Sequence, residues 1–223
     1  MGAVVGPGAL AGAVTPRLAR VSARGIDRLP SSDPDAGPAI VVANHTTIVD
    51  VAIVLHVMQR AGLWVDAPCR GGCAPGHRHA TVMATADILR FPVSKQLAKR
   101  TGVIAVERDG GAAAFRAARA SLEAGRVLLL YPEGDVSATA DGAPRPWRPG
   151  TATLARMAGV PVHPLAHHDS RRLGHGKVPV ALARAATGVW RLPPVRVLAG
   201  DAVPAEVTAS TPARDLEPLL AAA

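Results

Sequence analysis

The stretch Pro38-Ala-Ile-Val-Val-Ala-Asn44-His45-Thr-Thr-Ile-Val-Asp50 decides how the rest of the chain is interpreted. Its apolar run predicts a short buried strand that ends where Asn44 and His45 begin a loop. Residues five positions apart on a regular helix point about 140° away from each other. His45 and Asp50 can therefore meet only if His45 lies in the loop and the chain turns before the next helix begins.

A histidine with a carboxylate beside it is the smallest set of groups that makes a general base. The imidazole takes a proton, and the carboxylate holds its tautomer and stabilises the cation that forms. The apolar residues 48–61 predict a largely buried helix, which Thr46 or Thr47 would cap. The same residues are equally compatible with an ordinary helix start and an incidental histidine, so this stretch alone leaves both interpretations open.

Length and composition indicate one domain. The 223 residues would divide into an N-terminal arm over 1–18 and a single domain over 19–223. Because only 3% of residues are aromatic, the core must be built from Val, Leu, Ile and Ala. No run of about 20 uninterrupted apolar residues is present, so no spanning helix is expected. Two cysteines and a glycine-broken start without a preceding positive charge favour a cytoplasmic protein without a signal peptide.

The formal net charge of +8 favours acidic partners. These include anionic lipid headgroups at the inner face of a membrane, the phosphates of coenzyme A and an acidic carrier protein. The basic residues are scattered without interleaved aromatics, so nucleic-acid binding is not expected. Residues 9–24 mix arginine with apolar residues and predict either a basic helix on a membrane surface or an arm leading into a strand near 19–24.

Two cysteines and two histidines cluster in an irregular segment at Cys69, Cys73, His77 and His79. Their spacing is not one of the usual structural zinc patterns, and glycine and proline fall inside it. We therefore interpret this segment as a flexible loop and predict no bound metal.

Strands alternate with helices along the remaining chain, which indicates an α/β domain with a mainly parallel sheet flanked by helices. Further strands are predicted over 63–65, 103–106, 126–131, 160–166, 178–183 and 195–199, and helices over 80–100, 110–124, 150–159 and a short C-terminal segment from Pro212. In parallel sheets the chemistry gathers beyond the carboxyl ends of the strands. His45, Arg108 and Glu133 each follow a predicted strand there, and they supply a base, a cation and an acid.

Four sequence blocks occur in a recognisable order. They are Asn44-His45-x4-Asp50, Gly102-Val-Ile-Ala-Val-Glu-Arg108, Tyr131-Pro-Glu133-Gly134-x-x-Ser137 and Val160-Pro-Val-His-Pro164, with Gly25-Ile-Asp-Arg-Leu29-Pro30 and Trp147-Arg148-Pro-Gly150 as flanks. From about residue 20 to residue 203 the chain resembles the glycerophospholipid acyltransferases, whose best-known members are the lysophosphatidate acyltransferases.

The resemblance implies an acyl-coenzyme A or acyl-carrier-protein thioester as donor, with no further cofactor. His45 would deprotonate the acceptor hydroxyl and Asp50 would orient His45. The resemblance also implies a direct attack without an acyl-enzyme. The sequence agrees with this, since it has no Gly-x-Ser-x-Gly elbow and neither cysteine neighbours a block. Backbone N–H groups near Gly134 or after His45 would then bind the oxyanion.

The acceptor side of the site is also carried over from the resemblance. Arg108 would hold an acceptor phosphate, and Glu133 with Gly134 would form the acceptor-binding turn. An alternative role for Glu133 is structural, tying strand ends together.

One departure from the family pattern bears on the acceptor. Phosphate-using members usually read Glu-Gly-Thr-Arg-Ser in the third block, whereas this chain has Asp135 and Val136 after Gly134. Val136 removes a cation that would face a phosphate, so either Arg145 or Arg148 replaces it or the acceptor lacks a phosphate. We favour acyl transfer to a lysophospholipid or related glycerolipid. The alternatives are a soluble acyltransferase acting on a small hydroxyl- or amine-bearing metabolite and a non-catalytic lipid- or carrier-binding protein.

Overall fold

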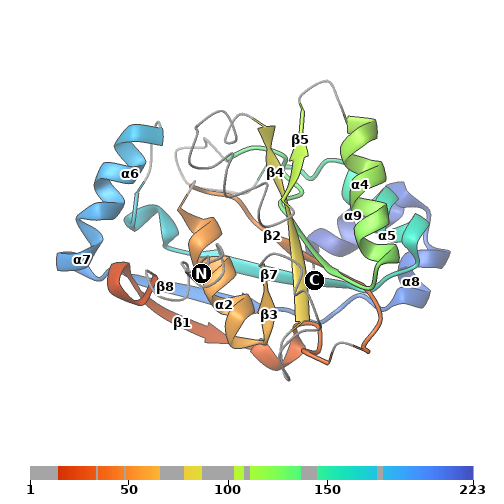
Figure 1. Ribbon diagram of the computed structural model, residues 1–223, viewed down its shortest axis with the longest axis horizontal. Helices are drawn as coiled ribbons and strands as arrows, with labels where there is room; N and C mark the ends of the chain where they lie inside the picture. The colour runs from red at the N-terminus through yellow and green to blue at the C-terminus, as the bar shows by residue number, and fades with distance from the viewer. Residues whose placement is uncertain are drawn as a thin grey trace, which may run out of the picture.

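The chain folds around a curled, mostly parallel sheet (Figure 1). The computed structural model describes residues 15–33, 35–47, 49–65, 78–86, 103–107, 111–136, 145–174 and 178–222. Within these residues the strands are β1 Arg20–Arg24, β2 Ala39–Ala43, β3 Leu63–Trp64, β4 Arg78–Thr85, β5 Ile104–Val106, β6 Val127–Leu130, β7 Val162–His168 and β8 Pro194–Ala199. The prediction of an α/β domain with a mainly parallel sheet is confirmed.

The strand order places β2 in the middle of the sheet. The path runs β1-β8-β7-β2-β6-β4-β3, and β5 pairs with β4. All pairings between these strands are parallel except the one between β7 and β8. The carboxyl ends of β7, β2 and β6 therefore meet at one edge, and polar residues that follow these strands come together there.

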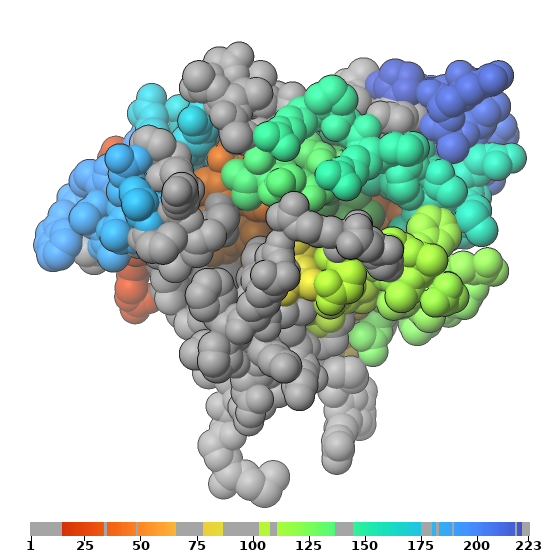
Figure 2. Space-filling model, turned by 90° about the horizontal axis from the view of Figure 1, so that it is seen from above, coloured from red at the N-terminus to blue at the C-terminus, as the bar shows by residue number. Residues whose placement is uncertain are grey.

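Helices cover both faces of the sheet. They are α2 Asp50–Arg60, α4 Gly111–Glu123, α5 Gly150–Ala158, α6 Val178–Ala186, α7 Gly188–Arg191, α8 Ala205–Ser210 and α9 Ala213–Ala222, with 3-10 turns η1 Ile26–Arg28 and η3 Ser170–Arg172. Both views place α6 and α7 at one end of the molecule and α8 and α9 at the other (Figures 1 and 2). Among the described residues, no helix has the length and apolar character needed to cross a bilayer.

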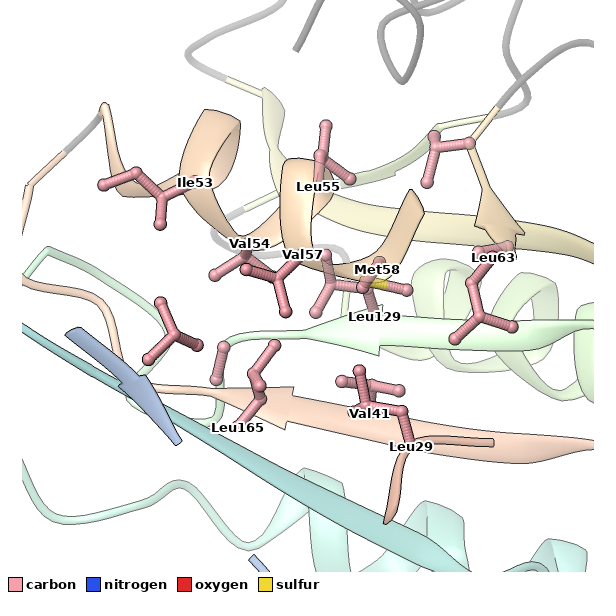
Figure 3. Close-up of a cluster of buried hydrophobic side chains, with 14 of the residues drawn as sticks. Leu29, Val41, Ile53, Val54, Leu55, Val57, Met58, Leu63, Leu129 and Leu165 are labelled. Carbon is pink, nitrogen blue, oxygen red and sulfur yellow. The ribbon is translucent and has the colours of Figure 1, made fainter. Parts of the chain in front are cut away.

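Strand β2 is buried along its whole length because it lies between two cores. Val41 packs with Met58 of α2 and with Leu129 of β6 on one face (Figure 3). Ile40 belongs to the other core, where Leu122 of α4 and residues of α5 cover the sheet. A strand buried on both faces reads as a continuous apolar run rather than as an alternation, which is why β2 was visible in the sequence.

Two predicted elements are of the wrong type. The first part of the helix predicted over 80–100 belongs instead to β4, because Ala80 and Val82 are buried where the strand pairs with β6. That pairing overrides the helix propensity of its alanine and methionine. Residues 87–100 of that prediction lie outside the described residues. The strand predicted over 178–183 is helix α6. A proline in the first helical turn loses no hydrogen bond, and the alanines that follow are strong helix formers.

The N-terminal segment combines parts of its two predicted alternatives, because residues 15–18 are helical and a strand follows them. Residues Arg20–Arg24 form edge strand β1, paired in parallel with β8, and not a surface helix. The prediction for residues 9–14 lies outside the described residues.

Candidate active site

His45 lies in the loop between β2 and α2, and the loop brings it to the first residue of the helix. Its Nδ1 lies 2.9 Å from Oδ1 of Asp50. The other carboxylate oxygen of Asp50, Oδ2, accepts the backbone N–H groups of Thr46 and Thr47 at 2.8 and 2.9 Å. The carboxylate thereby closes the turn that the five-residue spacing requires.

The two threonines act differently from the prediction. The residue before α2 makes no side-chain cap, so the expectation that Thr46 or Thr47 caps the helix is wrong. Asp50 takes over the loop N–H groups, which frees both hydroxyls. Thr46 Oγ1 lies 2.8 Å from Ser170 Oγ, and Thr47 Oγ1 donates to the carbonyl of Gly174. The loop that carries His45 is therefore fastened to the segment that follows β7.

Asp50 is fully buried and ionised. Burial alone raises the pKa of its carboxyl, but hydrogen bonds from His167 and His45 outweigh that effect and bring the pKa to about 2. Because Nδ1 of His45 donates to this carboxylate, Nε2 is the nitrogen that can accept a proton. The His45 side chain is 11% exposed, so a substrate can reach it.

An aromatic ring supports the imidazole from the end of β6. The ring centroids of His45 and Tyr131 are 4.4 Å apart, with an interplanar angle of 31°. Burial and the nearby charge of Asp50 raise the pKa of the Tyr131 hydroxyl well above its usual value. The phenol therefore stays neutral and serves as an apolar wall for His45.

Glu133 connects the loops around the site. Its Oε1 accepts the backbone N–H of His45 at 2.7 Å, and its Oε2 accepts the backbone N–H of Arg145 at 2.9 Å. The side chain is buried after β6, next to the end of β2. This geometry matches the structural alternative, in which Glu133 ties strand ends together.

A cation lies over the turn that follows Glu133. Gly134 has φ +70°, and a Cβ added to it would lie 2.6 Å from Nε of Arg148. The guanidinium of this exposed arginine thus packs directly on Gly134. The backbone N–H of Arg148 donates to the carbonyl of Pro132 at 2.8 Å. The structure therefore joins Gly134 and Arg148, two predicted acceptor-binding residues, in one turn.

Four of the candidate oxyanion donors hold the turns around the site. The N–H of Gly134 donates to the carbonyl of Tyr131. The N–H of His45 donates to Glu133, and those of Thr46 and Thr47 donate to Asp50. These four N–H groups hold the turn in this structure, and the assignment of oxyanion donors near Gly134 or after His45 stays a prediction.

Some predicted residues lie outside the described residues. These are Arg108, Ser137, Cys69, Cys73 and His77, whereas His79 falls within β4. Among the residues that the structure does describe, no group of three or more potential metal ligands is found.

Sequence reasoning missed two residues of the site, His167 and Ser170. His167 lies near the end of β7, where Nε2 is 3.3 Å from Oδ2 of Asp50. Its Nδ1 lies 3.1 Å from Ser170 Oγ. The sequence signal that could have found His167 is a polar residue at the end of an apolar strand, the same signal that pointed to His45 and Glu133. The fourth apolar strand also ends in a polar residue at the carboxyl edge, two residues beyond the pairing of Leu165 with Ala43.

A family model described as Acyltransferase matches residues 20–168. The chain belongs to the acyltransferase family. All four predicted blocks fall within this range. The matched region also contains every residue from His45 to His167 described above.

The acyltransferase also has a similar solved structure. It is the 1-acyl-sn-glycerophosphate (LPA) acyltransferase PlsC from Thermotoga maritima, with a TM-score of 0.70 and 17% sequence identity, covering 97% of this chain and 74% of that one. At this identity the likeness shows the fold, which is therefore that of PlsC. No curated protein matches the sequence.

Proposed function

We propose that this acyltransferase moves an acyl group from an acyl-coenzyme A or acyl-carrier-protein thioester to a hydroxyl of a lysophospholipid or related glycerolipid. The observation that carries the proposal is the buried pair of His45 and Asp50, joined at 2.9 Å at the carboxyl edge of the sheet. A histidine oriented in this way is suited to general-base catalysis near neutral pH.

The proposed reaction is a direct displacement. Nε2 of His45 takes the proton of the acceptor hydroxyl while that oxygen attacks the thioester carbonyl carbon. The tetrahedral intermediate collapses by breaking the C–S bond, and the departing sulfur takes the proton from the imidazolium. The products are an ester and a free thiol, and His45 returns to its starting state. Asp50 stays ionised throughout and stabilises the imidazolium.

The acceptor would be held by the turn after β6. Arg148 presents an exposed guanidinium over Gly134, close to Glu133 and therefore to the backbone of His45. Asp135 is turned toward its own backbone, since its Oδ1 accepts the N–H of Val136 at 2.8 Å. We assign to Arg148 the cation that Val136 does not supply, and a phosphate or phosphodiester on the acceptor is its natural partner. Arg108 remains a prediction from the family resemblance.

A basic surface, in which Arg196 is paired with Asp169 at 3.0 Å, supports an acceptor drawn from an anionic membrane. The segments 15–26 and 178–200 contain no Asp or Glu, and they carry six arginines, Arg17, Arg20, Arg24, Arg184, Arg191 and Arg196. Pairing of β1 with β8 brings these segments together at one end of the molecule (Figure 1). Trp190 of α7 is 83% exposed there. Tryptophan among arginines is typical of proteins that dock on anionic lipid surfaces.

This end of the molecule adjoins the site. The carbonyl of Gly174 accepts the hydroxyl hydrogen of Thr47 in the His45 loop. Gly174 also packs so closely on the backbone of Ala181 in α6 that a Cβ would collide with its carbonyl. A lipid acceptor at the α6–α7 surface would therefore lie next to the base.

Turnover of the His45→Ala variant tests the proposal. We expect loss of thiol release from acyl-coenzyme A by about 1,000-fold or more, because no other base replaces the imidazole. His56→Ala, which alters a half-buried histidine farther along α2, is the matched control and should keep full turnover.

The same assay identifies the acceptor. Lysophosphatidate, a lysophospholipid diester, monoacylglycerol and a small amino alcohol are each offered with one donor, and thiol release is compared. A preference for the phosphate-bearing lipids supports the proposal. Turnover of only the amino alcohol would instead support the soluble alternative, and undiminished turnover in His45→Ala would refute the role of His45.

A further inference from the structure

The carboxylate of Asp50 is held between two histidines, of which only one can reach a substrate. His45 approaches Oδ1, and its side chain is 11% exposed. His167 approaches Oδ2 at 3.3 Å, and its side chain is 0% exposed. The second histidine therefore cannot touch an acceptor or a thioester, but it lies against the group that orients the base.

The surroundings of His167 determine where its proton is. Nε2 lies 2.6 Å from the carbonyl oxygen of Asn44 and 3.3 Å from Oδ2 of Asp50. Both oxygens are acceptors, so Nε2 carries a hydrogen and donates it to this pair. In the neutral ring Nδ1 is then an acceptor, and the hydroxyl of Ser170 donates to it. Ser170 in turn accepts the hydroxyl hydrogen of Thr46 at 2.8 Å.

Hydrogen bonds with Asn44 fix the position of the His167 ring. The Asn44 side chain donates from Nδ2 to the carbonyl of His167 at 3.0 Å and accepts the N–H of His167 on Oδ1 at 2.8 Å. Together with the bond from Nε2 to the Asn44 carbonyl, three hydrogen bonds join the two residues across β2 and β7. Asn44 directly precedes His45, so a shift of His167 would be transmitted to the base.

We propose that His167 is a positioning residue of the catalytic pair. Its Nε2 hydrogen, with the N–H groups of Thr46 and Thr47, holds Oδ2 of Asp50 and leaves Oδ1 aimed at His45. Because both carboxylate oxygens of Asp50 are held in place, His45 keeps the orientation that proton transfer needs. The inference rests on the proposed function, because it assigns His167 a role only if His45 is the base.

The charge balance around Asp50 gives this role a measurable signature. Among the described residues, the titratable groups that face the carboxylate are His45, His167 and Tyr131, while Glu133 lies beyond the backbone of His45. Removing the donor from Oδ2 concentrates negative charge on the carboxylate, which then holds a proton on His45 more strongly. On the acid side of its pH profile (the acid limb), kcat/KM falls as His45 becomes protonated. Without the His167 donor, this acid limb should move to higher pH.

Two substitutions separate positioning from structural support. His167→Leu removes the donor, whereas the amide nitrogen of His167→Gln reaches the same place as Nε2. We expect His167→Leu to lower kcat by about 10- to 100-fold, with KM changed less than about twofold, and to move the acid limb upward. His167→Gln should recover most of kcat and return the acid limb of kcat/KM to its wild-type position. His168→Leu is the matched control, because that neighbouring side chain is 74% exposed and points away from Asp50.

The contrary results are equally specific. Full kcat in His167→Leu overturns the proposal. A second set of results also overturns it: His167→Leu and His167→Gln lose kcat equally, their acid limb does not move and their melting temperature falls. His167 would then be a structural residue only. Both results differ from failure of the proposed function itself, which would appear as undiminished turnover in His45→Ala.

Discussion

At the scale of single residues, one carboxylate organises the site. Asp50 begins α2, yet all the contacts of its oxygens described here lie outside the helix. Oδ2 closes the loop through Thr46 and Thr47, and Oδ1 orients His45. A charge buried in this way is stable only because donors surround it. The carboxylate that contacts His45 is thus also the one that shapes the loop.

The buried charge of Asp50 predicts how stability depends on pH. Its pKa is about 2 in the folded protein, below the ordinary value of 3.8 in the unfolded chain. The ionised carboxylate therefore stabilises the fold above about pH 4, and this contribution, about 2 kcal/mol, is lost as the pH falls from 4 to 2. Urea unfolding of the wild type and of Asp50→Asn at pH 5, 4, 3 and 2 measures it, and the difference between their free energies of unfolding should shrink by that amount.

A control for the loss of one negative charge is Asp201→Asn, whose carboxylate is 88% exposed. A pH-independent difference between the wild type and Asp50→Asn would show that Asp50 is not held ionised by the site. In that case its low pKa, and with it the charge that stabilises the imidazolium, would be ruled out.

At the scale of elements, the turn after β6 brings together Gly134 and Arg148, to which we assign the acceptor. Gly134 adopts a left-handed conformation and leaves room for the Arg148 guanidinium from the segment before α5. The sequence shows the glycine and the arginine fourteen positions apart but not their contact. That contact depends on the route of the intervening chain, which no local pattern describes.

Two glycines with the same backbone conformation allow this contact to be tested. Gly134→Ala places a Cβ against Arg148, whereas Gly125→Ala has nothing within 4 Å of the new atom. Both have φ above +65°, so both variants should lose about 1 kcal/mol of stability from backbone strain. Only Gly134→Ala should raise KM for a phosphate-bearing acceptor, by about fivefold or more, because it displaces the guanidinium.

Steady-state kinetics with the preferred acceptor measures the difference, and Arg148→Gln should reproduce it. An unchanged KM in both Gly134→Ala and Arg148→Gln would contradict an acceptor-binding role for Arg148. Urea unfolding of the two alanine variants confirms that their backbone strain is comparable.

At the scale of the whole molecule, charge and exposed apolar surface gather at the end formed by β1, β8, α6 and α7. Trp190 supplies a large amphipathic ring there and the arginines supply the charge. We expect wild-type protein to sediment with vesicles of phosphatidylcholine containing about one third phosphatidylglycerol, and to be released as salt rises from about 0.05 to 0.5 M. Trp190→Ser should reduce the partition coefficient by roughly tenfold, since the ring loses its apolar burial.

The control for that experiment is Met157→Ser, which removes another exposed apolar side chain, 53% exposed on α5. Equal binding by the two serine variants would exclude this end of the molecule as the docking surface. A wild-type protein indifferent to anionic vesicles would favour the soluble acyltransferase acting on a small metabolite.

Local sequence determined the fold class and the pairing of His45 with Asp50. The central strands are visible because a strand buried on both faces must be apolar throughout, and the spacing of His45 and Asp50 already required a loop before the helix. Only the tertiary structure decided that residues 80–85 form a strand, that the loop N–H groups are engaged, and that His167 faces Asp50. These outcomes depend on pairing between segments distant in the sequence, and the residues themselves do not specify which strand lies beside which.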